Sequence, residues 1–84
     1  MRYRYTKHAL LKINLLKQYR FVISKAFIED IIVHPKKREH KADGTYIAMA
    51  GYDDTHVLRV VYREEHDTIV IITLYPGRTK SYEI

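Results

Sequence analysis

Residues 56–75, which read HVLRVVYREEHDTIVIITLY, decide the fold of this 84-residue chain. Two runs within them, 56–64 and 68–75, are rich in β-branched and aromatic residues, a composition typical of strands. Only the short polar link 65–67 separates the runs. Because a link of this length joins neighbouring strands, the segment predicts an antiparallel hairpin.

The sequence on either side of this hairpin extends the predicted sheet. Residues 45–52 have the same strand-like composition, and the short polar link 53–55 connects them to the hairpin, which predicts a three-stranded antiparallel meander. After the last strand, residues 75–78 read YPGR and place Pro and Gly at the central positions of a type II turn. Residues 79–84 then form either a short edge strand or a tail.

Two helices are predicted ahead of the sheet. The hydroxyl of Thr6 caps a helix over about 7–19, whose apolar residues recur with helical spacing on one broad face. Ser24 caps a second helix over about 25–33, and Pro35 ends it.

The predicted fold class is therefore α+β, with two N-terminal helices packed on a three- to four-stranded antiparallel sheet. Residues 34–44 form a loop between helices and sheet, with a turn at Asp43-Gly44. A chain of 84 residues is too short for a second domain, so residues 1–84 are expected to form a single domain.

Alternation along the two strands of the hairpin assigns side chains to the sheet faces. The side chains expected to pack on the helices are Leu58, Val60, Tyr62, Val70, Ile72 and Leu74. Those expected on the outer face are Arg59, Arg63, Thr73 and Tyr75, together with Val57, Val61, Ile69 and Ile71. An outer face of this mixed character indicates either a binding surface or a protein interface.

The charge distribution is one-sided. The net charge is +5, and residues 1–41 carry eleven Lys and Arg against three acids. Such a surface attracts phosphate polymers, so RNA is an expected partner, although small proteins are also basic for solubility alone.

Several classes are excluded by composition. The absence of cysteine excludes disulfides and thiolate chemistry, and no apolar run reaches the about 18 residues of a transmembrane helix. We therefore expect a cytoplasmic protein with no membrane contact.

Four residues are candidates for RNA cleavage. Arg59 lies in the middle of an apolar strand, where a charge requires either an acidic partner or a phosphate. His8 lies in the first turn of the first helix, where it would be a proton donor or acceptor or a histidine with no role. Thr73 and Tyr75 would donate hydrogen bonds to phosphate or contact bases, although a tyrosine also suits a half-buried strand without any such role.

Further basic residues are candidates for contacts with nucleic acid, although a solvated basic loop is an equal interpretation of those in 36–41. These candidates are Lys7, Lys36, Lys37, Arg38, Arg63 and Arg78. His34 and His40 flank the loop without a further ligand at metal spacing, so no metal and no cofactor are predicted.

The order of short motifs along nearly the whole chain resembles the RelE/ParE-like toxin superfamily, and in particular an uncharacterised branch of it. The motifs are His-Ala-Leu at 8–10, a helix ending in proline at 31–35, Leu-Arg-Val-Val-Tyr at 58–62 and Ile-Thr-Leu-Tyr-Pro at 72–76.

The resemblance implies that the helices cover one sheet face and that the other holds the active site. It implies a toxin-like, metal-independent endoribonuclease that uses His8, Arg59, Thr73 and Tyr75, and an acidic antitoxin as partner. The chain departs from the best-known members because it lacks their catalytic C-terminal tail, unless Tyr82 serves. Fold analogy alone does not fix function. The alternatives are a nucleic-acid-binding module without chemistry, and an interaction domain that uses the outer sheet face, as in a homodimer.

Overall fold

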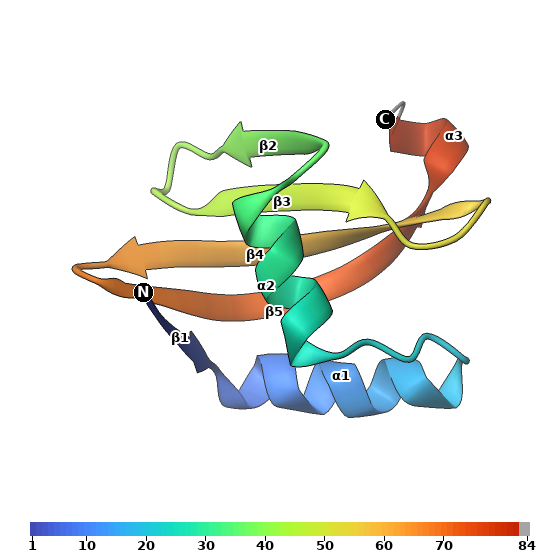
Figure 1. Cartoon of the computed structure of the whole chain (residues 1–84), viewed down its shortest axis with the longest axis horizontal. Helices are drawn as coiled ribbons and strands as arrows, with labels where there is room; N and C mark the ends of the chain where they lie inside the picture. Colours follow the sequence, from blue (N-terminus) through green and yellow to red (C-terminus); the bar gives the residue numbers. More distant parts are fainter. Residues whose placement is uncertain (83–84) are drawn as a thin grey trace.

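The computed structural model describes residues 1–82 and contains a five-stranded sheet with three helices (Figure 1). In chain order the elements are β1 (Arg2–Tyr5), α1 (Lys7–Gln18), α2 (Lys25–Val33), β2 (Lys37–His40), β3 (Tyr46–Gly51), β4 (His56–Glu65), β5 (Thr68–Arg78) and α3 (Thr79–Tyr82).

The sheet has the strand order β1-β5-β4-β3-β2. Its pairs are antiparallel except β1, which runs parallel to β5. Helix α2 crosses one face of the sheet, and α1 lies along the β5 side (Figure 1). The α+β class, both N-terminal helices and the β3–β4–β5 meander are therefore confirmed.

The predicted arrangement was incomplete at both sheet edges. Residues 2–5 form the edge strand β1, and residues 37–40, expected in a loop, form the opposite edge strand β2. Both strands are four residues long, and each of the residues of β2 is charged or a histidine. Short edges with charged side chains discourage pairing with other chains. Strand β2 has no apolar alternation for sequence analysis to detect, and the alternation of Arg and Tyr in β1 covers only four residues.

The predicted turn at residues 75–78 was wrong, because β5 continues through Pro76 to Arg78. The parallel partner β1 pairs only with residues 68–71, so the second half of β5 is an edge where a missing N–H is tolerated. Residues 79–82 form the short helix α3 instead of a strand or tail, and residues 83–84 lie outside the described part.

A β-bulge corrects the predicted faces of β5. Val61 pairs with Thr73, but Tyr62 pairs with Ile71, so Ile72 is the extra residue in the ladder. Because side chains alternate between faces, one extra residue reverses the face of every side chain that precedes it in the strand, relative to an unbroken alternation with those that follow. Ile69 and Ile71 therefore join the core beneath the helices, and Val70 faces outward, the reverse of the prediction.

Thr6 holds the bulge against the start of α1. Its backbone N–H donates to the carbonyl oxygen of Ile71 (3.0 Å), and its hydroxyl donates to that of Ile72 (2.8 Å). The same hydroxyl accepts from the N–H of Ala9, which confirms the predicted N-cap. A single residue thus caps α1 and satisfies two carbonyl groups of the bulge.

The core lies between the helices and one face of the sheet. It contains Ala9 and Leu16 from α1, Ile23, Ile28, Ile31 and Ile32 from the second helix and the segment before it, and Ala48, Leu58, Val60, Tyr62, Ile69, Ile71 and Leu74 from the sheet. Within residues 1–82, no helix is long and apolar enough to span a membrane.

Candidate functional site

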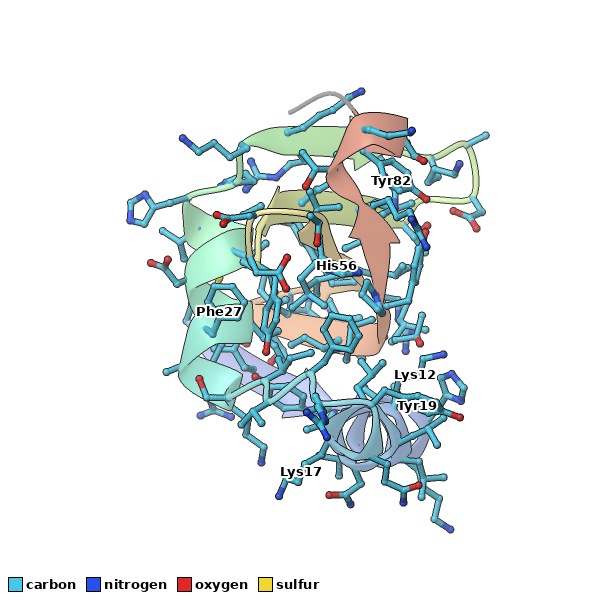
Figure 2. All side chains as sticks on the ribbon, turned by 90° about the vertical axis from the view of Figure 1, so that its right-hand side faces the viewer. Lys12, Lys17, Tyr19, Phe27, His56 and Tyr82 are labelled. Atoms are coloured by element: carbon cyan, nitrogen blue, oxygen red, sulfur yellow. The ribbon has the colours of Figure 1, made fainter. Side chains whose placement is uncertain are left out.

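The outer face, defined as the sheet face opposite α2, carries a group of cationic side chains from three of the five strands. Figure 2 shows Phe27 of α2 on one side of the sheet and Tyr82 of α3 on the other. The strand register places five cations and two acids on this face, a net charge of +3. They are Arg2, Arg4, Lys37, Arg59 and Arg63, with Glu39 and Glu65.

Arg59 is the centre of this face. It lies in the middle of β4, directly opposite Tyr75 of β5, and is only 6% exposed. Its Nε donates to the hydroxyl of Tyr75 at 2.9 Å, and its Nη1 donates to Oε2 of Glu39 at 3.3 Å. Nη1 also approaches the sulfur of Met49 at 3.6 Å. Both interpretations of Arg59 therefore have support, since it has an acidic partner and lies on a cationic face.

The surroundings of Arg59 keep it charged. Burial disfavours the charge, but the hydrogen bond with Tyr75 and the carboxylate of Glu39 outweigh burial and raise the pKa of Arg59 above its ordinary value. Three of its five N–H groups have partners, and the two on Nη2 have none among the described residues. Those two groups are suited to a phosphate oxygen.

Tyr82 of α3 completes the surroundings of Arg59. Its ring stacks on the guanidinium, with the central carbon 4.4 Å from the ring centroid. The ring reaches this position because residue 77 is glycine, and a Cβ there would lie 2.3 Å from Cε2 of Tyr82. Stacking covers one flat side of the guanidinium and leaves its edge for hydrogen bonds.

A second cluster lies on the same face at the C-terminal end of β4. Glu65 accepts hydrogen bonds from Nε of Arg63 and from Nη2 of Arg4, the latter at 3.4 Å. These bonds lower the pKa of Glu65 below its ordinary value, with the bond from Arg63 the largest cause. Thr73 lies on the outer face opposite Val61, between the two clusters.

The structure brings together only part of the predicted site. Arg59 and Tyr75 are hydrogen-bonded, and Thr73 shares their face. His8 and Lys7 lie exposed in the first turn of α1, and no hydrogen bond or ion pair within residues 1–82 joins either to Arg59.

The predicted nucleic-acid contacts divide between the faces. Lys37 and Arg63 lie on the outer face, and Lys36 is exposed just before β2. Arg38 points to the opposite face, where Nη2 donates to the carbonyl oxygen of Ile32 at the C-terminal end of α2. Arg78 lies at the far end of β5, opposite His56.

Three contributors to this site were missed or underrated by sequence analysis. Glu39 was assigned to a loop, although it reaches Arg59 across β3. Arg4 was assigned no role, and Tyr82 entered only through the resemblance. Contacts of this kind depend on strand order, which no local pattern reports.

Within residues 1–82 no three His, Asp or Glu side chains come together as metal ligands. Comparison with known proteins returns no matching family model, no similar curated protein and no similar solved structure. The fold and the site therefore define the protein only by its structure, as a small α+β protein with a cationic sheet face centred on one buried arginine.

Proposed function

We propose that the outer face binds the phosphate backbone of RNA and that the protein is a toxin-like, metal-independent endoribonuclease. The observation that carries this proposal is Arg59, a buried guanidinium with two N–H groups not used by the described residues, at the centre of a face with net charge +3. Cations arranged on one face are the electrostatic footprint of nucleic-acid binding. The resemblance to RelE/ParE-like toxins supports the same face and the same arginine.

The proposed chemistry assigns one task to each side chain. Arg59 stabilises negative charge that develops on the phosphate, and its hydrogen bonds to Tyr75 and Glu39 hold it in place for this task. Tyr75 and Thr73 position the scissile phosphate. His8 transfers a proton to or from the ribose 2′-hydroxyl or the leaving oxygen, which requires RNA to extend from the outer face to the start of α1.

Replacement of His8 by alanine tests the catalytic part of this proposal. We expect the normal protein to cleave labelled RNA in EDTA, and His8→Ala to cleave about 10²- to 10⁴-fold more slowly, the usual contribution of a general acid or base. The RNA affinity of His8→Ala should equal that of the normal protein at each salt concentration in the range of roughly 50–200 mM, as measured by fluorescence anisotropy. His34→Ala, which removes another exposed histidine, is the matched control.

Two outcomes would contradict the catalytic assignment. Equal cleavage by His8→Ala and His34→Ala would remove His8 from the mechanism. Salt-dependent binding with no cleavage by any variant would leave the alternative, a nucleic-acid-binding module without chemistry.

A second candidate function, protein interaction, is favoured by α1 and not by the outer sheet face. The outer-face side chains Val57 and Val70 are fully buried, whereas large apolar side chains are exposed along α1 and just after it. These are Leu10, Leu11, Leu15, Tyr19 and Val22, which we name the α1 stripe. Leu11, Leu15 and Tyr19 recur at intervals of four residues, so they form one row.

The charge around the α1 stripe indicates its partner. Residues 7–28 contain five Lys and Arg and no acid, so a second copy would bring like charges together. An acidic amphipathic helix fits both the apolar row and its basic surroundings, and the antitoxin implied by the resemblance is also acidic. We propose such a helix as the partner of α1.

A synthetic acidic amphipathic peptide of three to four helical turns, labelled with a fluorophore, tests this surface. We expect Leu15→Glu to weaken its binding about tenfold or more, because the substitution places a like charge in the apolar row. Val33→Glu changes an equally accessible apolar residue on α2 and should have little effect. The assignment fails if both variants bind the peptide as the normal protein does, or if sedimentation shows the chain pairing with itself through α1.

A further inference from the structure

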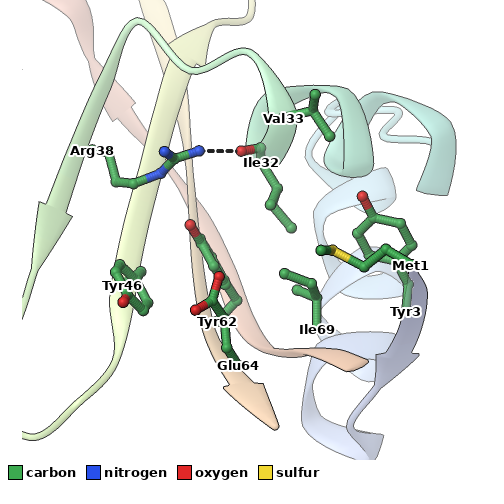
Figure 3. A pocket seen from close by; sticks show the side chains of 9 residues that line it. All are labelled: Met1, Tyr3, Ile32, Val33, Arg38, Tyr46, Tyr62, Glu64 and Ile69. Carbon is green, nitrogen blue, oxygen red and sulfur yellow. Dashed lines mark hydrogen bonds between the residues drawn. The ribbon is translucent and has the colours of Figure 1, made fainter. Parts of the chain in front are cut away.

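A pocket of about 360 Å³ lies on the helix-covered side of the sheet, on the face opposite Arg59. It opens between the C-terminal end of α2, strands β3 and β4, and the β1 end of the chain (Figure 3). Its volume is within the range of small-molecule sites. Because it lies on the other face, its occupation does not rest on the function proposed for Arg59.

One wall of the pocket is a row of aromatic rings. Tyr46 and Tyr62 line the pocket and stack at a centroid distance of 5.3 Å, and His40, which is outside the lining, stacks on Tyr46 at 4.2 Å. Tyr62 is only 2% exposed, so the end of this row is fixed by packing. Ile69 and Ile32 add apolar surface to the lining. A rigid wall of this kind suits a flat, partly apolar ligand.

Two tyrosine hydroxyls at the pocket lack hydrogen-bond partners among residues 1–82. The hydroxyls of Tyr3 and Tyr46 make no hydrogen bond with any of residues 1–82, whereas those of Tyr5, Tyr52 and Tyr75 all do. These hydroxyls give the pocket hydrogen-bonding capacity that the protein does not use.

Two opposite charges also line the pocket. Arg38 and Tyr62 both line the pocket (Figure 3). Burial raises the pKa of Tyr62, and the positive charge of Arg38 opposes that rise. The bond from Arg38 to the carbonyl oxygen of Ile32 uses one of its five N–H groups. Glu64 of β4 supplies the carboxylate. A matching ligand must therefore offer acceptors to a guanidinium and N–H donors to a carboxylate.

We propose that this pocket binds a guanine base, with Glu64 accepting from its N1–H and N2–H edge and Arg38 donating to its O6 and N7 edge. Guanine fits because it has adjacent donors on one edge and two adjacent acceptors on another, and arginine is the usual partner of O6 and N7. Adenine keeps the N7 acceptor but has a donor at position 6 and no N–H at position 1, so it loses the bidentate bonds to both Arg38 and Glu64. The base belongs either to a free nucleotide or to single-stranded RNA.

Titration with guanosine and adenosine 5′-monophosphates, followed by NMR shifts of the tyrosine rings, tests the site. We expect guanosine monophosphate to bind about tenfold or more tightly than adenosine monophosphate, the discrimination of one good bidentate pair. Glu64→Gln should remove this preference. Glu65→Gln is the matched control, because it makes the same charge change at the next residue, which pairs with Arg63 on the outer face.

Further titrations distinguish a free nucleotide from RNA as the source of the base, and they include the results that would overturn the proposal. The site is assigned to RNA if the pentamer UUGUU binds more tightly than guanosine monophosphate and UUAUU binds weakly. It is assigned to a free nucleotide if guanosine monophosphate binds more tightly than UUGUU. Equal binding of both mononucleotides, or of ribose 5-phosphate, would overturn the proposal, because attraction of phosphate to the basic protein would then explain it. Equal behaviour of Glu64→Gln and Glu65→Gln would also overturn it.

Discussion

Arg59→Ala should reduce RNA affinity about tenfold or more, the amount expected for loss of a charged hydrogen bond of about 1.5–3 kcal/mol. It should also slow RNA cleavage about 10²- to 10³-fold, the loss that follows removal of one group stabilising transition-state charge. The physical reason is that Arg59 is the one cation at the centre of the outer face with hydrogen bonds that fix its direction. Anisotropy and cleavage of the same labelled RNA measure the two effects.

Two control variants separate the charge of Arg59 from its geometry. Arg59→Lys keeps the charge, but one ammonium group lacks the planar fork that reaches Tyr75 and Glu39 together, so an intermediate loss is expected. Glu39→Gln removes one negative charge from the outer face, while its amide oxygen can still accept from Nη1 of Arg59, so RNA binding should become tighter. The side chain of Glu39 is 34% exposed, which allows it to remain solvated when Arg59 is absent.

Circular dichroism and urea unfolding decide whether these losses are specific. Arg59→Ala should unfold cooperatively, with its helical signal unchanged. Normal cleavage by folded Arg59→Ala would remove the arginine from the mechanism. If Arg59→Ala is unfolded, its loss of cleavage does not support the role of Arg59, and Arg59→Lys becomes the deciding variant.

Ile71→Ala should destabilise the protein by about 2–5 kcal/mol, the cost of truncating a fully buried isoleucine. Ile71 is 0% exposed beneath the helices, and an 84-residue domain has a stability of roughly 4–13 kcal/mol. The substitution Ile71→Ala is therefore expected to remove a large part of the free energy of unfolding.

Ile72→Ala is the matched comparison because the same atoms are removed one residue later. Ile72 is the extra residue of the bulge and only half-buried, so its truncation should cost less than about 2 kcal/mol. Urea unfolding with unchanged m-values measures both. A larger cost at Ile72 than at Ile71 would mean that β5 alternates without a bulge and that the predicted faces were right.

Features governed by neighbouring residues were predictable from the sequence. The caps at Thr6 and Ser24 were found because each hydroxyl bonds an N–H three residues away. Strand β4 was found because it is rich in β-branched and aromatic residues and because the links on either side of it are short. Arg59 and Tyr75 were placed on one face correctly, because both lie on the same side of the bulge.

Features that depend on distant chain segments were not predictable. The bulge at Ile72 is satisfied by Thr6, a residue 66 positions earlier, and no local pattern in β5 signals it. Glu39 reaches Arg59 only because β2 adds to the far side of β3, and its strand has no apolar alternation. Pro76 and Gly77 suggested a turn, although the first occupies a free strand edge and the second makes room for the ring of Tyr82.

The parallel pairing of β1 with β5 has a consequence for folding speed. It joins residues 2–5 to residues 68–71, so almost the whole chain must be ordered or closed as a loop before these strands meet. Contacts of such high sequence separation raise contact order and slow folding, whereas the β3–β4–β5 meander closes through short turns. The meander is thus suited to form early, and β1 to close the sheet last. Since Thr6 directly follows β1 and caps α1, the first helix gains its final anchor only in that late step.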